Sequence, residues 1–314
     1  MTTLSSVARS AAATAAVAGT IHAARYWSTA RRITWAPGAG ETHDGSLHTR
    51  VRGTGTDGVL LIHGLGGSNS YWGEPFDQVA GSGRLVVPDL LGFGASPRPD
   101  VRYDADDHVG ALVDTLDQLG VTSPVVVGAH SVGCLVALAL ARCRPDRVSA
   151  IVAICPPLYE NPEHARQRIA RLGWIERQLA FDTPMAATAC RLVCDHREAA
   201  AALTAVARPG LPAVIRRGGV QHTWASYAGT FRSLLAAAEG DRWLADVECP
   251  VALIAGARDG ITDLDHLAAL ADEYSHVTLD VQHGADHSLP LTHPAVCVDA
   301  IVEARTIRRA ALRD

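Results

Sequence analysis

A serine lies between small residues in the sequence GAHSVG at 128–133, where a hydroxyl serves no obvious packing role. The apolar run SPVVV precedes this stretch and a second apolar run, CLVALALA, follows it. This pattern predicts a buried strand, a tight turn and a helix, the arrangement that presents a nucleophile on a strained elbow. Ala129 and Gly133 are small enough for such a turn to close. The alternative interpretation of Ser131 is a residue that only caps the helix.

A serine hydroxyl is a weak nucleophile, so catalysis requires a base and an acid that orients the base. Two other loops supply these groups, because GARDG at 256–260 contains Asp259 and HGADHSLPLTHP at 283–294 contains His287. We therefore predict that Ser131 is the nucleophile, His287 the base and Asp259 the orienting acid.

Other residues of the same loops compete for these roles. The rival acids, Asp263 and Asp265, fall within the next predicted helix. The rival bases are His283 at a strand end and His293 at the predicted start of the final helix. His283, Asp286 and His287 could together bind a metal, but Ser131 would then have no explanation, so we expect neither a metal nor a cofactor.

Short apolar runs alternate with helical patterns along most of the chain. The predicted strands lie at 47–53, 58–64, 83–89, 124–130, 148–157, 250–259 and 277–284. Predicted helices occupy 103–120, 134–146, 263–274 and the residues from 294 onward. Such alternation predicts an α/β fold with a mainly parallel central sheet flanked by helices. Functional groups gather at the carboxyl edge of such sheets, which is where the loops described above begin.

The alternation is interrupted at 157–247, where no buried strand is recognisable and the helical stretches are punctuated by proline and glycine. We interpret this segment as an all-helical lid. The domains are then a core at 41–156 and 248–314, the lid at 157–247 and an N-terminal helical extension at 1–40. Trp224 and Tyr227 of the lid are candidates for lining a substrate pocket.

The chain from about 45 to 305 resembles the α/β-hydrolase superfamily, specifically its lid-bearing serine esterases, lipases and carbon–carbon bond hydrolases. The matching motifs are HG at 63–64, PDLLGFGAS at 88–96, AHSVG at 129–133, GARDG, and GADHSLPLTHP at 284–294. Two departures are Ala129, where the elbow usually begins with glycine, and Asp286, where the family often has glycine before the base.

The resemblance implies an oxyanion hole formed by the backbone N–H groups of Leu65 and Val132. Such donors stabilise the negative charge of a tetrahedral acyl-transfer intermediate, each contributing roughly 10²–10³ in rate. Gly64, Gly66 and Gly67 would let the backbone of the first loop approach the substrate.

Two histidines belong to the same site loops. His63 begins the glycine-rich loop, and His130 directly precedes the predicted nucleophile. We interpret His130 as a supporting residue whose ring packs under the elbow or bonds a neighbour, rather than as a catalytic group.

Composition excludes several other functions. The 28 basic residues are all arginine, which excludes a lysine Schiff base or a P-loop lysine, and the net charge of −5 gives no nucleic-acid footprint. The seven cysteines form no CxxC pair. Cys190, Cys194 and His196 are close enough to suggest a metal site, but we expect reduced structural thiols and a cytoplasmic protein.

The apolar centre of the N-terminal segment, residues 11–21, is too short to span a bilayer. We predict a helix that packs on the body or contacts a membrane surface peripherally. A processed signal or an anchor is the alternative, which would make the protein exported or membrane-associated.

We therefore expect a serine hydrolase that cleaves carboxylic esters of small hydrophobic molecules through an acyl-enzyme. The same three residues could serve a perhydrolase, an acyltransferase or cyclase, or a carbon–carbon bond hydrolase, although the last usually has tryptophan where Ser288 follows the base. Haloalkane dehalogenases and epoxide hydrolases place aspartate at the elbow, so Ser131 argues against both. The non-enzymatic alternative is a ligand receptor on a hydrolase scaffold.

Overall fold

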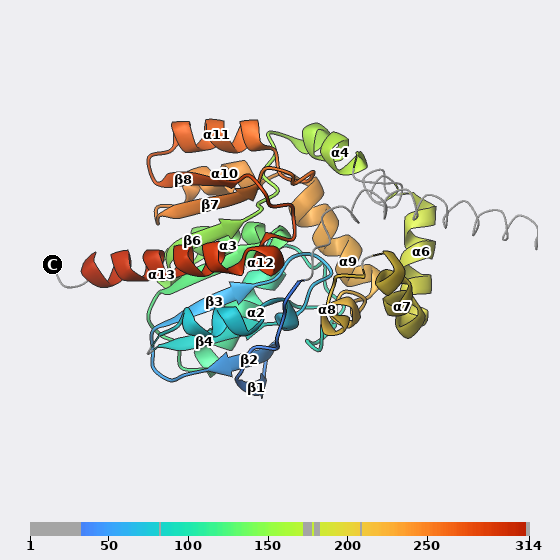
Figure 1. Ribbon diagram of the computed structural model, residues 1–314, viewed down its shortest axis with the longest axis horizontal. Helices are drawn as coiled ribbons and strands as arrows, with labels where there is room; N and C mark the ends of the chain where they lie inside the picture. Colours follow the sequence, from blue (N-terminus) through green and yellow to red (C-terminus); the bar gives the residue numbers. More distant parts are fainter. Residues whose placement is uncertain (1–32, 82, 172–177, 179–182, 208, 312–314) are drawn as a thin grey trace, which may run out of the picture.

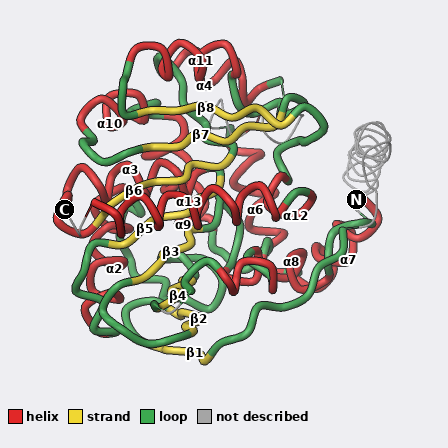
Figure 2. The backbone as a smooth tube through the Cα atoms, turned by 60° about the vertical axis from the view of Figure 1, so that its left-hand side comes forward, coloured by secondary structure: helices red, strands yellow, loops and turns green. Residues whose placement is uncertain are grey.

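An eight-stranded sheet forms the centre of the protein in the computed structural model, which describes residues 33–311 except 82, 172–177, 179–182 and 208 (Figure 1). Its strands follow the order β1-β2-β4-β3-β5-β6-β7-β8. β1 and β2 are antiparallel to their neighbours and the other pairs are parallel. Figure 2 shows the strands stacked in this order from β1 at the bottom to β8 at the top. Their bounds are Glu41–Asp44, His48–Arg52, Gly58–Ile62, Arg84–Pro88, Val125–His130, Val148–Ile154, Val251–Gly256 and Val277–Gln282 for β1 to β8.

Helices cover both faces of the sheet, which is why its central strands are apolar on both sides. In β3, Leu60 and Ile62 pack into one buried cluster, whereas Val59 and Leu61 pack into the other. The first cluster includes residues from α2 (Ala105–Gln118), α3 (Val132–Cys143), α10 (Gly240–Asp246) and α11 (Leu264–Glu273). The second includes residues from the 3₁₀ segment η2 (Glu74–Gln78) and α13 (Pro294–Ala311). The α/β class and the flanked, mainly parallel sheet are confirmed.

The described residues between β6 and β7 form helices joined by loops, with no strand among them, and we call residues 157–247 the helical insertion. Its outer helices lie beyond the end of the sheet opposite the C-terminus (Figure 1). The π-helical η4 (Phe231–Ala236) returns to the core, where Phe231 and Leu234 are buried. Besides α10 and η4, the described part of the insertion contains α4 (Pro162–Ala170), α6 (Pro184–Asp195), α7 (Arg197–Ala207), α8 (Ala213–Gly218) and α9 (Trp224–Thr230).

Sequence patterns missed one strand and predicted a helical extension at 1–40, of which the structure describes residues 33–40 and shows no helix there. β1 was not predicted, since its four residues carry no apolar alternation and are largely exposed. Residues 33–40 are irregular, and the carbonyl of Ala36 accepts a hydrogen bond from the N–H of Glu74 at 2.9 Å. The rest of the predicted N-terminal helix lies outside the described residues. Within the described part of the chain, no helix is both long and apolar enough to cross a bilayer.

Candidate active site

Ser131 occupies a strained turn between β5 and α3. Its backbone has φ 55° and ψ −128°, a conformation that a non-glycine residue adopts rarely and at a cost of about 1–3 kcal/mol. The N–H of Ser131 donates to the carbonyl of Ile154 at 3.0 Å, which fixes the turn to the end of β6. The hydroxyl makes no capping bond to α3. The capping interpretation is therefore wrong, and Oγ is available for another partner.

Glycines permit the close packing around this turn. A Cβ at Gly64 would lie 2.9 Å from Cβ of Ser131, and one at Gly133 would lie 2.6 Å from the carbonyl oxygen of His63. Contacts below about 3.0 Å are not tolerated without movement of the neighbour. Only glycine therefore fits both positions, which hold the loop after β3 against the turn and α3 against β3.

The structure brings the predicted nucleophile, base and acid into one hydrogen-bonded chain. Nε2 of His287 lies 3.0 Å from Oγ of Ser131, and Nδ1 lies 2.8 Å from Oδ2 of Asp259. The three residues come from the loops that follow β5, β8 and β7, as the sequence pattern predicted. Ser131 and Asp259 are buried, and the side chain of His287 is 19% exposed. The geometry is that of a nucleophile, a base and an orienting carboxylate.

Asp259 is an ionised carboxylate in a buried position. Burial alone would raise its pKa, but the charge of His287 and several hydrogen bonds outweigh it and hold the pKa well below the usual range. The donors include Thr262 Oγ1 at 2.7 Å and the N–H of Ile261 at 2.8 Å. Because an ionised carboxylate only accepts, Nδ1 of His287 must carry a proton. In the neutral ring, Nε2 is then the acceptor that faces the hydroxyl of Ser131.

His130 supports the base through the main chain. Its Nε2–H donates to the carbonyl of His287 at 2.8 Å, and its ring stacks on Tyr71 with centroids 4.8 Å apart. Burial, followed by the repulsion of His287, lowers the pKa of His130 to about 3. The ring therefore stays neutral at physiological pH and acts as a donor, which agrees with its predicted supporting role.

His63 is a buried structural histidine in one tautomer. The N–H of Leu90 donates to its Nε2 at 2.9 Å, so Nδ1 carries the proton and donates to the carbonyl of Gly64 at 2.8 Å. Burial lowers the pKa of His63 and keeps the ring neutral. The side chain links the loop after β3 to the loop after β4.

The loop of residues 64–67 turns tightly beneath the helical insertion. The N–H of Gly67 donates to the carbonyl of Gly64 at 3.0 Å, and Gly66 has φ +64°. A Cβ on Gly66 would lie 3.4 Å from the carbonyl oxygen of Gly219 and 3.5 Å from Cε2 of Tyr227. Tyr227 therefore lies against the loop that contains Leu65, and its place in a substrate pocket stays a prediction.

The other residues predicted around the elbow have simpler surroundings. Val132 begins α3, so its N–H is one of the first four in the helix and has no intrahelical acceptor. Trp224 contacts Arg232 of the insertion, whose guanidinium lies 5.6 Å from the ring centroid. Its place in a substrate pocket remains a prediction.

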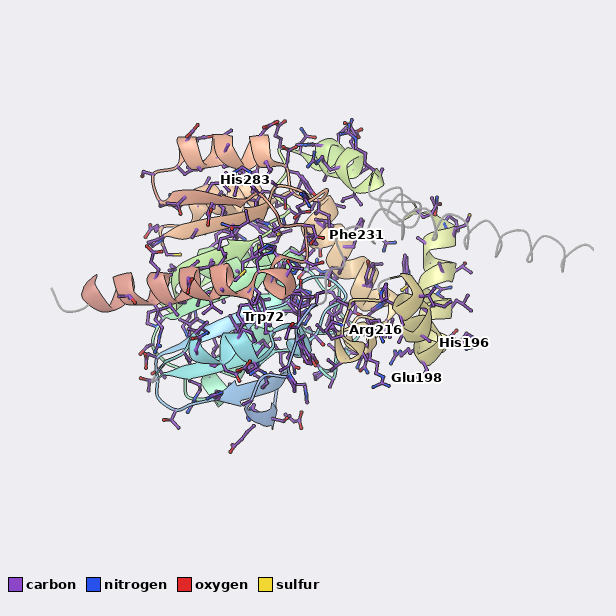
Figure 3. All side chains as sticks on the ribbon, viewed as in Figure 1. Trp72, His196, Glu198, Arg216, Phe231 and His283 are labelled. Carbon is purple, nitrogen blue, oxygen red and sulfur yellow. The ribbon has the colours of Figure 1, made fainter. Side chains whose placement is uncertain are left out.

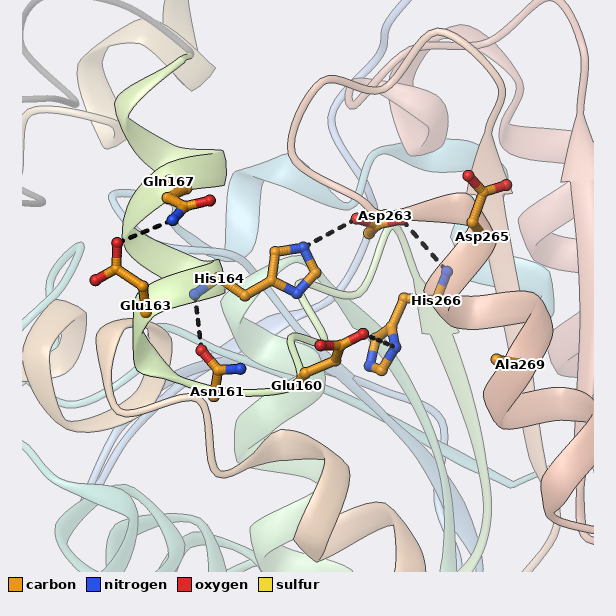
Figure 4. A pocket seen from close by; sticks show the side chains of 9 residues that line it. All are labelled: Glu160, Asn161, Glu163, His164, Gln167, Asp263, Asp265, His266 and Ala269. Atoms are coloured by element: carbon orange, nitrogen blue, oxygen red, sulfur yellow. Dashed lines mark hydrogen bonds and ion pairs between the residues drawn. The ribbon is translucent and has the colours of Figure 1, made fainter.

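Asp263 and His283, the alternatives for the acid and the base, lie in other surroundings. A cavity of about 590 Å³ lies between α4 and α11, and none of the three hydrogen-bonded residues lines it (Figure 4). Asp263 caps α11 there and pairs with His164 of α4 at 3.0 Å. His266 pairs with Asp241 at 2.7 Å in the same region. His283 is exposed (Figure 3). The cavity therefore separates the first helix of the insertion from the core, away from Ser131.

Sequence reasoning missed three residues that surround the site. Thr262 bonds Asp259, and Tyr71 stacks on His130. Cys155 has φ 51° at the end of β6, and burial raises the pKa of its thiol. Only Thr262 had a usable signal, because a hydroxyl three residues after a buried acid can bond its carboxylate; the other two depend on tertiary contacts.

Comparison with known proteins establishes the family. Residues 58–294 match the family model described as the alpha/beta hydrolase fold, and the chain belongs to this family. Over 261 residues it is 30% identical to a protein of Enterobacter cloacae named as a carbamate hydrolase, RutD, covering 77% of this chain and 90% of that protein.

Two further matches are more limited. The chain is 31% identical over 179 residues to Probable lysophospholipase BODYGUARD 4 of Arabidopsis thaliana, but this spans 50% of the chain and 43% of that longer relative. A solved structure of a hydrolase from Pseudomonas aeruginosa superimposes with a TM-score of 0.65 at 21% identity, covering 85% of this chain and 98% of that one. This last likeness concerns the fold alone.

Proposed function

We propose that the protein is a serine hydrolase that cleaves carboxylic esters of hydrophobic molecules. The hydrogen-bonded chain from Ser131 through His287 to Asp259 carries this proposal. It contains a hydroxyl that can attack a carbonyl, a nitrogen that can accept its proton, and a buried carboxylate that stabilises the resulting imidazolium.

The reaction proceeds in two halves. Oγ of Ser131 attacks the ester carbonyl carbon while its proton moves to Nε2 of His287, which forms a tetrahedral oxyanion. The backbone N–H groups of Val132 and Leu65 are proposed to bind this oxygen, and the N-terminus of α3 favours the negative charge. Collapse breaks the bond to the alkoxy oxygen, which takes the proton from His287. Water, deprotonated by the same nitrogen, then attacks the Ser131 ester. The bond from the acyl carbon to Oγ breaks, Oγ takes the proton back from His287, and the carboxylic acid leaves.

The helical insertion supports a hydrophobic substrate. Several of its apolar side chains are exposed, including Met185, Leu192 and Val214. Tyr227 adds an aromatic ring directly beside the loop of residues 64–67. We propose that the insertion acts as a lid and that these side chains receive the apolar part of the ester.

The test is a panel of p-nitrophenyl esters and thioesters of graded chain length, which includes a dienol-ketone substrate for carbon–carbon hydrolysis. We expect ester turnover to fall by at least about 10⁴-fold in Ser131→Ala. The matched control is Ser123→Ala, a half-buried serine in the loop before β5, which should retain wild-type turnover. A fluorophosphonate probe should label the wild type and the control, but not Ser131→Ala.

Two results would contradict the proposal. Wild-type turnover in Ser131→Ala would exclude this nucleophile. A folded wild-type protein that neither reacts with the probe nor cleaves any ester would favour a ligand receptor on a hydrolase scaffold.

A further inference from the structure

Two thiols and an imidazole meet in the helical insertion. Sγ of Cys190 and Sγ of Cys194 lie 4.0 Å apart, and each lies 3.9 Å from Nδ1 of His222. His222 is buried and the two cysteines are half-buried. The sequence suggested His196 as the third member, but that residue is exposed and lies on the outer side of the insertion (Figure 3).

The three atoms are spaced as ligands of a single ion. A point equidistant from atoms separated by 4.0, 3.9 and 3.9 Å lies about 2.3 Å from each of them. Zinc–sulfur bonds measure about 2.3 Å and zinc–imidazole bonds about 2.0–2.1 Å. A cation could therefore bind with adjustments of only a few tenths of an ångström.

The surrounding structure holds these ligands in place. Cys190 and Cys194 are four residues apart in α6, so both side chains project from one face of the helix. The carbonyl of His222 accepts from Sγ of Cys194 at 3.3 Å and from Nη2 of Arg197 at 3.1 Å. Its ring packs against Tyr227, with centroids 4.8 Å apart. The imidazole is therefore restrained both at its backbone and on its ring face.

We propose that Cys190, Cys194 and His222 bind a thiophilic d¹⁰ cation, Zn²⁺ or Cu⁺. Both ions take thiolate and imidazole ligands, whereas Mg²⁺ and Ca²⁺ take oxygen ligands. Binding requires loss of the two thiol protons. With Zn²⁺ the centre is neutral and leaves a fourth position for water. With Cu⁺ it is three-coordinate and carries one negative charge beside the guanidinium of Arg197.

A cation at this site would connect α6 to the segment from His222 to Tyr227. α6 supplies two ligands, and His222 lies just before α9, whose Tyr227 contacts the loop of residues 64–67. The cation would therefore link α6 to the position of Tyr227. This inference does not depend on the proposed hydrolase activity.

The experiment uses the full-length, fully reduced protein. Binding of Zn²⁺ alone is measured by competition with a chromophoric chelator, and binding of Cu⁺ by the same method under anaerobic conditions. We expect one equivalent of at least one of the two ions. Cys190→Ser, Cys194→Ser and His222→Asn should each weaken binding by at least about 100-fold.

Matched controls test whether this particular cluster binds. Cys143→Ser removes an exposed thiol and His196→Asn removes the neighbouring exposed histidine, so both should bind as the wild type does. The proposal is overturned if the folded wild type retains neither ion, or if His196→Asn loses binding as His222→Asn does.

A wild-type measurement keeps the test decisive if the ligand variants do not fold. The chain has seven cysteines, and all are free thiols. Mass spectrometry after limited alkylation should show that the ion protects Cys190 and Cys194 while Cys143 reacts unchanged. Equal alkylation of Cys190 and Cys194 with and without both ions would refute the site.

Discussion

The sheet and the helical insertion hold their apolar residues in opposite ways. Val59 to Ile62 of β3 are all 0% exposed, whereas Leu203 and Val206 of α7 are 70% and 72% exposed. Burial from both sides fixes this core strand, because Val59 to Ile62 alternate between the two buried clusters on either face of the sheet. The insertion lacks such enclosure at its outer helices. The core therefore carries the fold, and the insertion carries surface that is available to other molecules.

The core and the insertion also differ in which candidate catalytic residues they supply. Ser131, Asp259 and His287 lie on loops that leave strands of the sheet, and none of the three comes from the insertion. The insertion approaches them through Tyr227 and Gly219, which lie against the loop of residues 64–67. Substitutions in the core loops should therefore have the largest effect on turnover, and substitutions in the core strands the largest effect on stability. Substitutions in the outer helices should have the smallest effect on both.

The largest difference is expected between two neighbouring aspartates. Asp259→Asn should lower kcat/KM for a cleaved ester by roughly 10⁴-fold, because the neutral amide no longer holds His287 in the required tautomer. Asp263→Asn keeps a capping residue on α11 and removes only the pairing with α4, so the loss should be below about 10-fold. Similar losses in both variants would show that the insertion contributes directly to the chemistry.

A pair of leucines tests the contrast in burial. Leu60→Ala in β3 should reduce the free energy of unfolding by about 2–5 kcal/mol, since it leaves a cavity between the sheet and its helices. Leu203→Ala in α7 should change it by no more than about 0.5 kcal/mol. Denaturant unfolding of both variants measures these changes. A cost above 2 kcal/mol for Leu203→Ala would mean that a partner covers α7 in solution.

Substitutions of two helical glycines test how tightly α3 packs on the sheet. Gly133→Ala should destabilise the protein by about 1–3 kcal/mol, because its Cβ would lie 2.6 Å from the carbonyl oxygen of His63. Gly110→Ala in α2 should instead stabilise it by about 0.5–1 kcal/mol, since the new methyl group would have no atom within 4 Å other than its chain neighbours and the backbone of its own helix. Thermal unfolding distinguishes the two, and a stabilised Gly133→Ala variant would contradict the packing described.

The smallest effect concerns the join between the core and the insertion. The hydrogen bond to Asp241 raises the pKa of His266 above its usual value near 6.5. The pair therefore contributes fully below about pH 6.5, and the contribution is lost as the pH rises through the raised value. His266→Gln should cost up to about 1 kcal/mol at pH 5.5 and less at pH 9, measured by denaturant unfolding. An equal cost at both pH values would exclude an ionic contribution, and His283→Gln serves as the exposed control.

The sheet could be predicted from the sequence because its strands are buried on both faces and appear as continuous apolar runs. The residues around Ser131 could be predicted because parallel strands bring their following loops to one edge. β1 could not be predicted, since an exposed edge strand of four residues has no apolar pattern.

Contacts between segments that are far apart in the sequence also could not be predicted. His222 lies 32 positions after Cys190 and 28 positions after Cys194. The three residues come together only because of the path that α7 and α8 take between them. Proximity in sequence favoured His196 instead. The helical periodicity places the thiols on one face but does not indicate which loop returns to them.

The hydrogen bond from His130 to the carbonyl of His287 has a consequence for engineering the protein. The residue that precedes the nucleophile holds the main chain of the base directly, over 157 positions of sequence. This hydrogen bond joins the nucleophile's turn to the loop of the base, and both belong to the core. Exchanging the insertion for one of another shape should therefore change which molecules reach the site. The alignment of Ser131 with His287 should stay the same.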